Sequence, residues 1–161
     1  MNERTIIGDD TDGPRLGEIG LQQFAPYLMN RIMGRYNASL REDLAKLGLT
    51  TPKMRARAVL SVIDNLAISR LAVYAITEQS TLSRALDVLE TDGLVRRTAD
   101  PEDSRATRIS ITEAGRAAFE TLWPTMRHSY EHMFAGIDVA ERTAFVATLQ
   151  KMLLNVREHE F

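Results

Sequence analysis

The sequence predicts a mainly α-helical protein with one small two-stranded β-hairpin, an α+β fold, and three observations lead to this class. Apolar residues recur at every third or fourth position through most of the 161 residues, as on one face of a helix. The period changes to two on either side of a polar loop at 99–106. The composition, 44% apolar and 26% charged, is that of a folded globular chain of about one domain.

The first part of the chain predicts a flexible arm at 1–17 and then one long helix. The arm combines glycine, proline and acidic residues without a period. The helix is expected at 19–47, with Gly48 as its C-terminal stop. Its apolar stripe is unbroken and consists of Leu21, Phe24, Leu28, Ile32, Tyr36, Leu40, Leu44 and Leu47. A stripe of this length exceeds what one small lobe can cover, which indicates a partner chain.

Three shorter helices are expected next, at 51–63, 68–75 and 79–91. Pro52 is typical of a first helical turn, and Gly93 follows the end of the third helix. The inward face of the first of them is expected to be Met54, Ala58, Val59, Val62 and Ile63. The inward face of the third is expected to be Leu82, Ala85, Leu86 and Leu89.

A hairpin follows these helices. Residues 94–98 and 107–111 alternate as short strands, and the loop between them is too polar to be anything but a turn. Three short helices followed by a two-stranded hairpin form a winged helix-turn-helix. The sequence therefore predicts a winged lobe at 50–111.

Two helices end the chain, at 113–134 and 138–157. Pro124 is expected to kink the first of them. Both have apolar faces outside the winged lobe, as does the long first helix. We therefore expect 18–49 and 112–161 to form a helical dimerisation region and the protein to be a homodimer.

The composition excludes several classes of protein. The chain has no cysteine, which rules out disulfides, thiolate metal sites and a cysteine nucleophile. No run of about 18 apolar residues is present, and residues 1–17 lack the apolar core of a signal peptide. We expect a cytoplasmic protein with no membrane partner, no cofactor and no metal.

Charge is distributed unevenly along the chain. The net charge is −2, yet residues 52–116 hold 10 basic and 9 acidic side chains, and all but one of those cations are arginine. Arginine suits bidentate contact with phosphates and guanines. A solvated surface would give a balance of this size as well.

The helix at 79–91 has the features of a DNA-recognition helix. Its outward face begins with short hydrogen-bonding side chains and one arginine, and the run 79–84 after Glu78 contains no acid. The candidate DNA-binding residues on it are Gln79, Ser80, Thr81, Ser83 and Arg84. The alternative is an ordinary amphipathic helix with a polar outer face.

The hairpin tip is a second candidate contact. Asp103 and Arg105 are two residues apart, so in an extended segment the carboxylate could hold the guanidinium. An oriented arginine on a narrow β-ribbon fits a minor groove, where negative potential is concentrated. The alternative is a surface ion pair that only stabilises a turn.

Two stretches resemble the multiple antibiotic resistance regulator (MarR) family: TLSRALDVLETDGLVRR at 81–97, and the wing at 100–106 with ISITEAG at 109–115. The resemblance covers one domain at about 20–157. It implies a dimer formed by the first and last two helices, whose winged lobes bind a pseudo-palindrome in double-stranded DNA. It also implies release by a small-molecule effector of phenolic type.

The resemblance also implies roles for single residues. Ser80, Thr81, Ser83 and Arg84 would face the major groove. Arg105, oriented by Asp103, would enter the minor groove, and Arg96 and Arg97 would contact phosphates. Ile76 departs from the family, because members often have glycine there, and the preceding helix is expected to run on slightly.

Other candidate sites carry less chemistry. His128 and His132 have the spacing of half a zinc site without further ligands, so we expect two exposed or interfacial histidines. Methionines could line an adaptable pocket or belong to the core. The candidate ligand-binding residues are Met33, Tyr36, Met126 and Tyr130. No catalytic motif is present, so we do not expect an enzyme.

Two functions from different classes remain open. The first is a ligand-responsive, dimeric DNA-binding transcriptional regulator. The second is a small-molecule or metal-binding helical dimer that acts as a protein-interaction module without DNA binding. Retention of Arg84, Arg96, Arg97 and Arg105 in one lobe favours the first.

Overall fold

The computed structural model describes residues 13–103 and 105–159. The chain divides into two compact units, 1–39 and 40–161. The division falls inside the long helix, and the sequence-based division into arm, winged lobe and dimerisation region stays a prediction.

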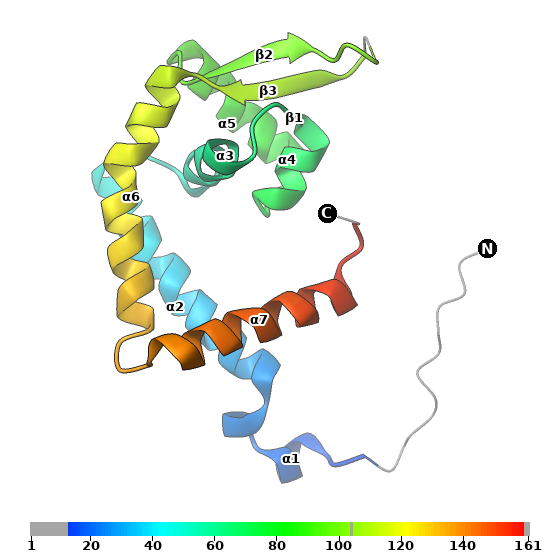
Figure 1. Ribbon diagram of the computed structural model, residues 1–161, viewed down its shortest axis with the longest axis vertical. Coiled ribbons are helices and arrows are strands. Elements are labelled where there is room, and N and C mark those ends of the chain that lie inside the picture. Colours follow the sequence, from blue (N-terminus) through cyan, green and yellow to red (C-terminus); the bar gives the residue numbers. More distant parts are fainter. Residues whose placement is uncertain (1–12, 104, 160–161) are drawn as a thin grey trace, which may run out of the picture. The chain divides into compact units, whose positions relative to one another are not determined.

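The first unit holds a short helix, a single 3-10 turn and most of a long helix (Figure 1). These are α1 (Leu16–Ile19), η1 (Leu21–Gln23) and α2 (Ala25–Lys46), which continues into the second unit. The predicted start of the long helix at residue 19 is wrong, because Gly20 has a φ of 76° and Phe24 is extended. Helix α1 begins inside the predicted arm, whose first twelve residues lie outside the described part of the chain.

The second unit contains the predicted helices and hairpin in the predicted order. In chain order these are α3 (Thr51–Val62), β1 (Leu66–Ala67), α4 (Ile68–Tyr74), α5 (Gln79–Thr91), β2 (Val95–Ala99), β3 (Thr107–Ile111), α6 (Glu113–Met133) and α7 (Val139–Val156). Helix α6 continues through Pro124 as a single element, and Thr112 and Asp138 cap α6 and α7 with their side chains.

The sheet has three strands rather than the predicted two. Its order is β1-β3-β2 and all pairs are antiparallel, with Leu66 opposite Ile109 and Val95 opposite Ile111. Strand β1 is only two residues long, too short for a periodic signal. It anchors β3 to the helices, while β2 and β3 continue outward as the wing (Figure 1).

The core of this unit is formed by side chains from every one of its elements from α3 to β3. They are Ala56, Leu60, Leu66, Leu71, Ala72, Leu82, Leu86, Leu89, Val95, Ile109 and Ile111. The predicted inward face of α3 is wrong in part. Helix α3 buries Met54, Ala56, Arg57 and Leu60, whereas Val62 is 83% exposed.

Three helix ends share one hydrogen-bond pattern. At the ends of α2 and α5, Gly48 and Gly93 have positive φ, and the next amide reaches back to the carbonyl of Leu44 or Leu89. At the end of α4 the same place is taken by Ile76, with a φ of 49°. Helix α4 therefore does not run on as expected, and a β-branched residue occupies a conformation that favours glycine.

Gly115 fixes how α6 leaves the wing. A Cβ at this position would overlap the carbonyl oxygen of Leu94, so only glycine allows this approach. The Thr112 hydroxyl donates to the carbonyl of Gly93 at 2.7 Å and accepts from the amide of Gly115 at 3.0 Å. The start of α6 is thereby joined to the end of α5.

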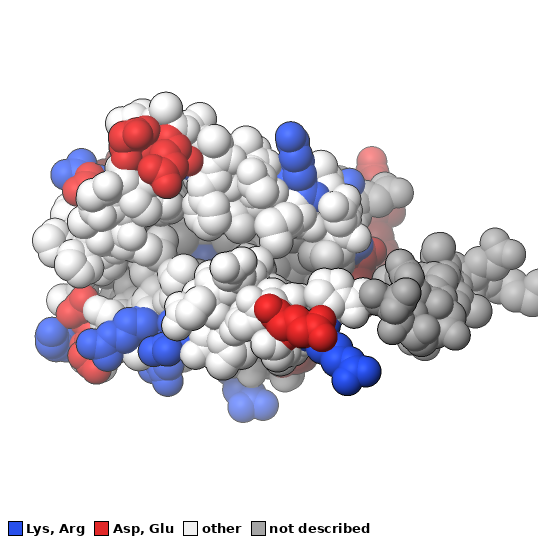
Figure 2. Space-filling model, turned by 90° about the horizontal axis from the view of Figure 1, so that it is seen from below, with Lys and Arg blue, Asp and Glu red and all other residues white. Residues whose placement is uncertain are grey.

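Much of the face in Figure 2 is uncharged, and its charged side chains lie in separate small groups. Large apolar side chains are exposed on α6 and α7, and α7 has no buried residue among those described. Examples are Trp123, Phe145, Leu153, Leu154 and Val156. No helix in the described part of the chain is long and apolar enough to cross a membrane.

Candidate nucleic-acid interface

Helix α5 presents one apolar and one polar face, as predicted. Leu82, Ala85, Leu86 and Leu89 are buried. The opposite face exposes Gln79, Ser80, Thr81 and Arg84, whereas Ser83 is half-buried. The exposed side chains are gathered in the first two turns of α5, where its free N–H groups favour phosphate.

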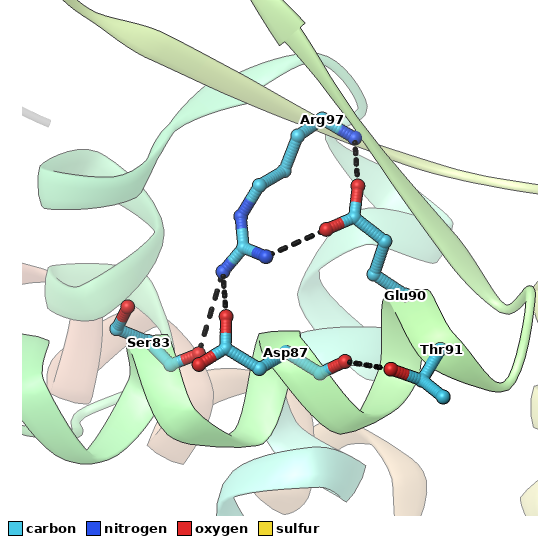
Figure 3. Close-up of polar contacts among 5 residues, drawn as sticks. All are labelled: Ser83, Asp87, Glu90, Thr91 and Arg97. Atoms are coloured by element: carbon cyan, nitrogen blue, oxygen red, sulfur yellow. Dashed lines mark hydrogen bonds and ion pairs between the residues drawn. The ribbon is translucent and has the colours of Figure 1, made fainter.

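Arg97 joins the wing to α5 (Figure 3). Its Nη1 donates to Glu90 Oε2 at 2.7 Å, and its Nη2 lies 2.8 Å from Asp87 Oδ1 and 3.4 Å from the carbonyl oxygen of Ser83. The backbone amide of Arg97 also donates to Glu90 Oε1 at 3.1 Å. Burial opposes the charge, but the hydrogen bonds that Arg97 donates to Glu90 and Asp87 outweigh it and raise the pKa of Arg97.

Neighbouring Arg96 lies on the other face of strand β2. Because successive strand residues point to opposite faces, Arg97 turns toward α5 and Arg96 turns away from it. Arg96 is exposed and free to meet a phosphate. The guanidinium of Arg97 pairs with Asp87 and Glu90, which favours a positioning role, and its expected phosphate contact stays a prediction.

Asp103 and Arg105 are joined by a backbone contact rather than by the expected ion pair. Asp103 Oδ1 accepts a hydrogen bond from the backbone amide of Arg105 at 2.9 Å. No ion pair between these two side chains is present in the described part of the wing. Asp103 therefore shapes the turn that presents Arg105, and the exposed guanidinium of Arg105 is not held by the carboxylate.

The base of the loop is fixed by an ion pair that sequence reasoning missed. Arg108 Nε lies 2.6 Å from Asp100 Oδ2, and its Nη1 donates to the carbonyl of Asn65 at 3.1 Å. The amide of Glu102 donates to Asp100 Oδ1 and, with Arg108, lowers the pKa of Asp100. The register of the hairpin, in which Ala99 pairs with Thr107, brings Asp100 and Arg108 close together. A prediction of this register from the sequence could have found the ion pair.

The four candidate ligand-binding residues are divided between the two units, and a common site for them stays a prediction. Met33 and Tyr36 belong to α2 in the first unit. In the second unit, Met126 lines a groove between α3 and α6, whereas Tyr130 lines a different hollow with α7. The described residues contain no cluster of three or more metal-ligating side chains, and His128 and His132 are exposed.

Comparison with known proteins gives one consistent result. Residues 54–115 match the model of a winged helix DNA-binding domain family. The HTH-type transcriptional repressor IacR of Pseudomonas putida is 30% identical over 146 residues, which cover 91% of this chain and 85% of IacR.

Solved structures agree with these matches. A transcriptional regulator of the MarR family from Silicibacter pomeroyi has 58% identity and a TM-score of 0.87, over 92% of this chain and 100% of that one. BpsR of Bordetella bronchiseptica, whose DNA binding is regulated by 6-hydroxynicotinic acid, has 24% identity and a TM-score of 0.69 over 80% of this chain and 97% of its own. The second likeness is one of fold.

Proposed function

Because this chain belongs to the MarR family of winged-helix, DNA-binding transcriptional regulators, we propose that it binds a pseudo-palindromic operator as a homodimer. In each half-site α5 enters the major groove and the wing enters the minor groove. Gln79, Ser80, Thr81, Ser83 and Arg84 face the bases. The observation that carries the proposal is the pair of ion pairs from Arg97 to Asp87 and Glu90, which connects the wing strand β2 to helix α5.

The apolar faces of α2, α6 and α7 support the dimer. Leu153 and Leu154 are 62% and 58% exposed, and Ile32 on α2 is 46% exposed. Side chains of this kind rarely remain in water over whole helices. An obligate interface between two copies would bury about 2,000 Å² or more and cover them.

We propose that a small molecule regulates this chain, as 6-hydroxynicotinic acid regulates BpsR, and that the chain is a repressor, as IacR is. In this proposal a small aromatic, phenolic-type effector relieves binding to the operator. The site of action is then the cytoplasm, where the DNA lies, and no catalytic step is involved.

Sedimentation velocity with and without an operator duplex tests the proposal. The free protein is expected to sediment as a dimer of the 18.1 kDa chain at low micromolar concentration, and one dimer is expected to bind one duplex. Replacement of Leu153 by Glu should give a monomer that binds the duplex far more weakly. The proposal is contradicted if the wild-type protein is a folded monomer that binds the duplex one to one. In that case its affinity would equal that of Leu153→Glu.

A further inference from the structure

The turn between α4 and α5 places a β-branched residue in a conformation that favours glycine. Ile76 has a φ of 49°, whereas Gly48 and Gly93 occupy the equivalent positions after α2 and α5. A strained residue of this kind persists only where the surrounding structure fixes its backbone. The Ile76 side chain is 78% exposed, so its own packing contributes little to that. Contacts to the backbone of the turn therefore hold it in place.

The longest-range of these contacts comes from α3. Nη1 of Arg55, 21 positions before Ile76, donates to the carbonyl oxygen of Ile76 at 2.9 Å and lies 3.5 Å from the carbonyl oxygen of Ala75. The hydroxyl of Thr77 also donates to the Ala75 carbonyl, at 3.0 Å. Both carbonyls lie at the C-terminal end of α4, where the helix dipole favours a cation. Arg55 is half-buried, so water competes less for its hydrogen bonds.

This turn determines where the recognition helix begins. Helix α5 starts at Gln79, three positions after Ile76, and the exposed side chains of Ser80 and Thr81 follow directly. A rotation of the backbone in the turn would displace all three side chains relative to the base edges. Hydrogen bonds weaken steeply with distance and angle, so a small displacement would reduce discrimination between bases.

We propose that Arg55 is a positioning residue for DNA recognition, which holds the strained turn at Ile76 and thereby fixes the start of α5. The inference rests on the proposed function, because it concerns how α5 is presented to the operator. Arg55 acts through the two carbonyls and not through contact with DNA. Ile76→Gly should make the guanidinium largely dispensable, because glycine adopts a positive φ without strain.

A double-mutant cycle tests the inference, with the full chain and a duplex selected from a random DNA library. Arg55→Met should weaken binding on the order of tenfold, because it removes charge-assisted hydrogen bonds that hold the turn. It should also reduce discrimination among single-position variants of the duplex, without a change in the salt slope. Ile76→Gly alone should bind within about twofold of the wild type, and Arg55→Met in that background should cost about threefold or less.

Two further variants serve as controls. Arg55→Lys keeps a cation that can donate to the same carbonyls, so it should lose less affinity than Arg55→Met. It also carries the comparison if Arg55→Met does not fold. Arg116→Met is the matched control, because Nη1 of Arg116 donates to the carbonyl of Ser61 at 2.9 Å, away from the turn. It should lower the Tm to a similar extent and leave base discrimination unchanged.

Three results would overturn the inference. A salt slope lower by about one in Arg55→Met would mean that its guanidinium contacts a phosphate. An equal loss of affinity with isoleucine and with glycine at position 76 would mean that Arg55 does not act through the turn. An equal loss of discrimination in Arg116→Met would mean that general destabilisation is the cause. If the wild type binds the duplex and Arg55→Met binds it equally well, only this inference fails. If the wild type selects no duplex, the proposed function fails.

Discussion

Nη1 of Arg97, on the wing strand β2, lies 2.7 Å from Oε2 of Glu90 on the recognition helix α5. The same guanidinium reaches Asp87 one turn earlier, so one side chain connects two positions that are one helical turn apart. These contacts join the wing strand β2 to α5 at two positions of the helix. We therefore expect Arg97 to affect DNA binding through geometry and its neighbour Arg96 to act through direct contact.

Replacement of Arg96 and Arg97 separates contact from positioning. Arg97→Met should lower the free energy of unfolding by about 1 kcal/mol or less, because the carboxylates of Glu90 and Asp87 that it leaves are 39% and 63% exposed and can be solvated. It should weaken DNA binding without a change in the dependence of affinity on salt. Arg96→Met should leave stability unchanged and lower the salt slope by about one for each phosphate that Arg96 neutralises.

Urea unfolding and fluorescence anisotropy at several salt concentrations measure the two quantities. The assignment is wrong if Arg97→Met lowers the salt slope while its stability equals that of the wild type.

Arg84 and Arg105 are expected to divide recognition between the two grooves. Arg84→Ala should cost about 1–3 kcal/mol of binding and relax preference at one position in each half-site. Arg105→Ala should weaken binding to nearly all sites, and most where A·T-rich flanks narrow the minor groove. A panel of single-position operator mutants distinguishes the two effects. The two assignments are wrong if Arg84→Ala weakens binding equally at all operator mutants while Arg105→Ala alone changes the base preference.

Asp103 should act through the turn that it caps. Its Oδ1 accepts from the amide of Arg105, and an asparagine side chain can accept in the same way. Asp103→Asn should therefore bind DNA at least as well as the wild type, and Asp103→Ala should bind more weakly. If both variants lose affinity equally in the same anisotropy assay, the negative charge rather than the turn is what matters.

Ile76 should be a source of strain. Because it adopts a φ of 49°, Ile76→Gly should raise the free energy of unfolding by about 1 kcal/mol. Gly93→Ala, at the equivalent position after α5, should lower it by a similar amount, about 1 kcal/mol. Urea denaturation of both variants measures the difference. A destabilised Ile76→Gly would mean that the isoleucine side chain contributes more than its backbone costs.

Asp100 should make the wing sensitive to acid. Its pKa lies below the ordinary value of 3.8, so its ionised form stabilises the folded wing above that pH. That contribution should disappear as the pH falls through the folded-state pKa. An NMR titration of the Asp100 carboxyl carbon follows the change, with Asp100→Asn as the control. A titration midpoint above 3.8 would contradict the assigned contacts.

The sequence predicted what depends on long periodic signals. The helices could be predicted because their apolar spacing begins next to capping residues, as at Thr112 and Asp138. The two wing strands could be predicted from their period of two. Strand β1 was not, since two residues carry no period. The start of α2 was misplaced because the apolar spacing continues through Gly20 although the backbone leaves the helix there.

The site was predicted less completely, for physical reasons that differ by residue. Period-two alternation already implies that Arg96 and Arg97 face opposite ways, so that signal was present in the sequence. Arg57 gave no such signal. A charged residue is ordinarily placed outward, which shifted the predicted inner face of α3 toward Val62 and away from Leu60.

Selection of binding sites from a random DNA library, followed by anisotropy of the selected duplex from 50 to 200 mM salt, tests DNA binding by this chain most directly. We expect enrichment of a pseudo-palindrome whose half-sites lie about one helical turn apart. We also expect a fall in affinity on the order of 10³–10⁵-fold over that salt range if six to ten phosphates are contacted per dimer. Absence of an enriched palindrome together with a flat salt response would contradict DNA binding as the function of this chain.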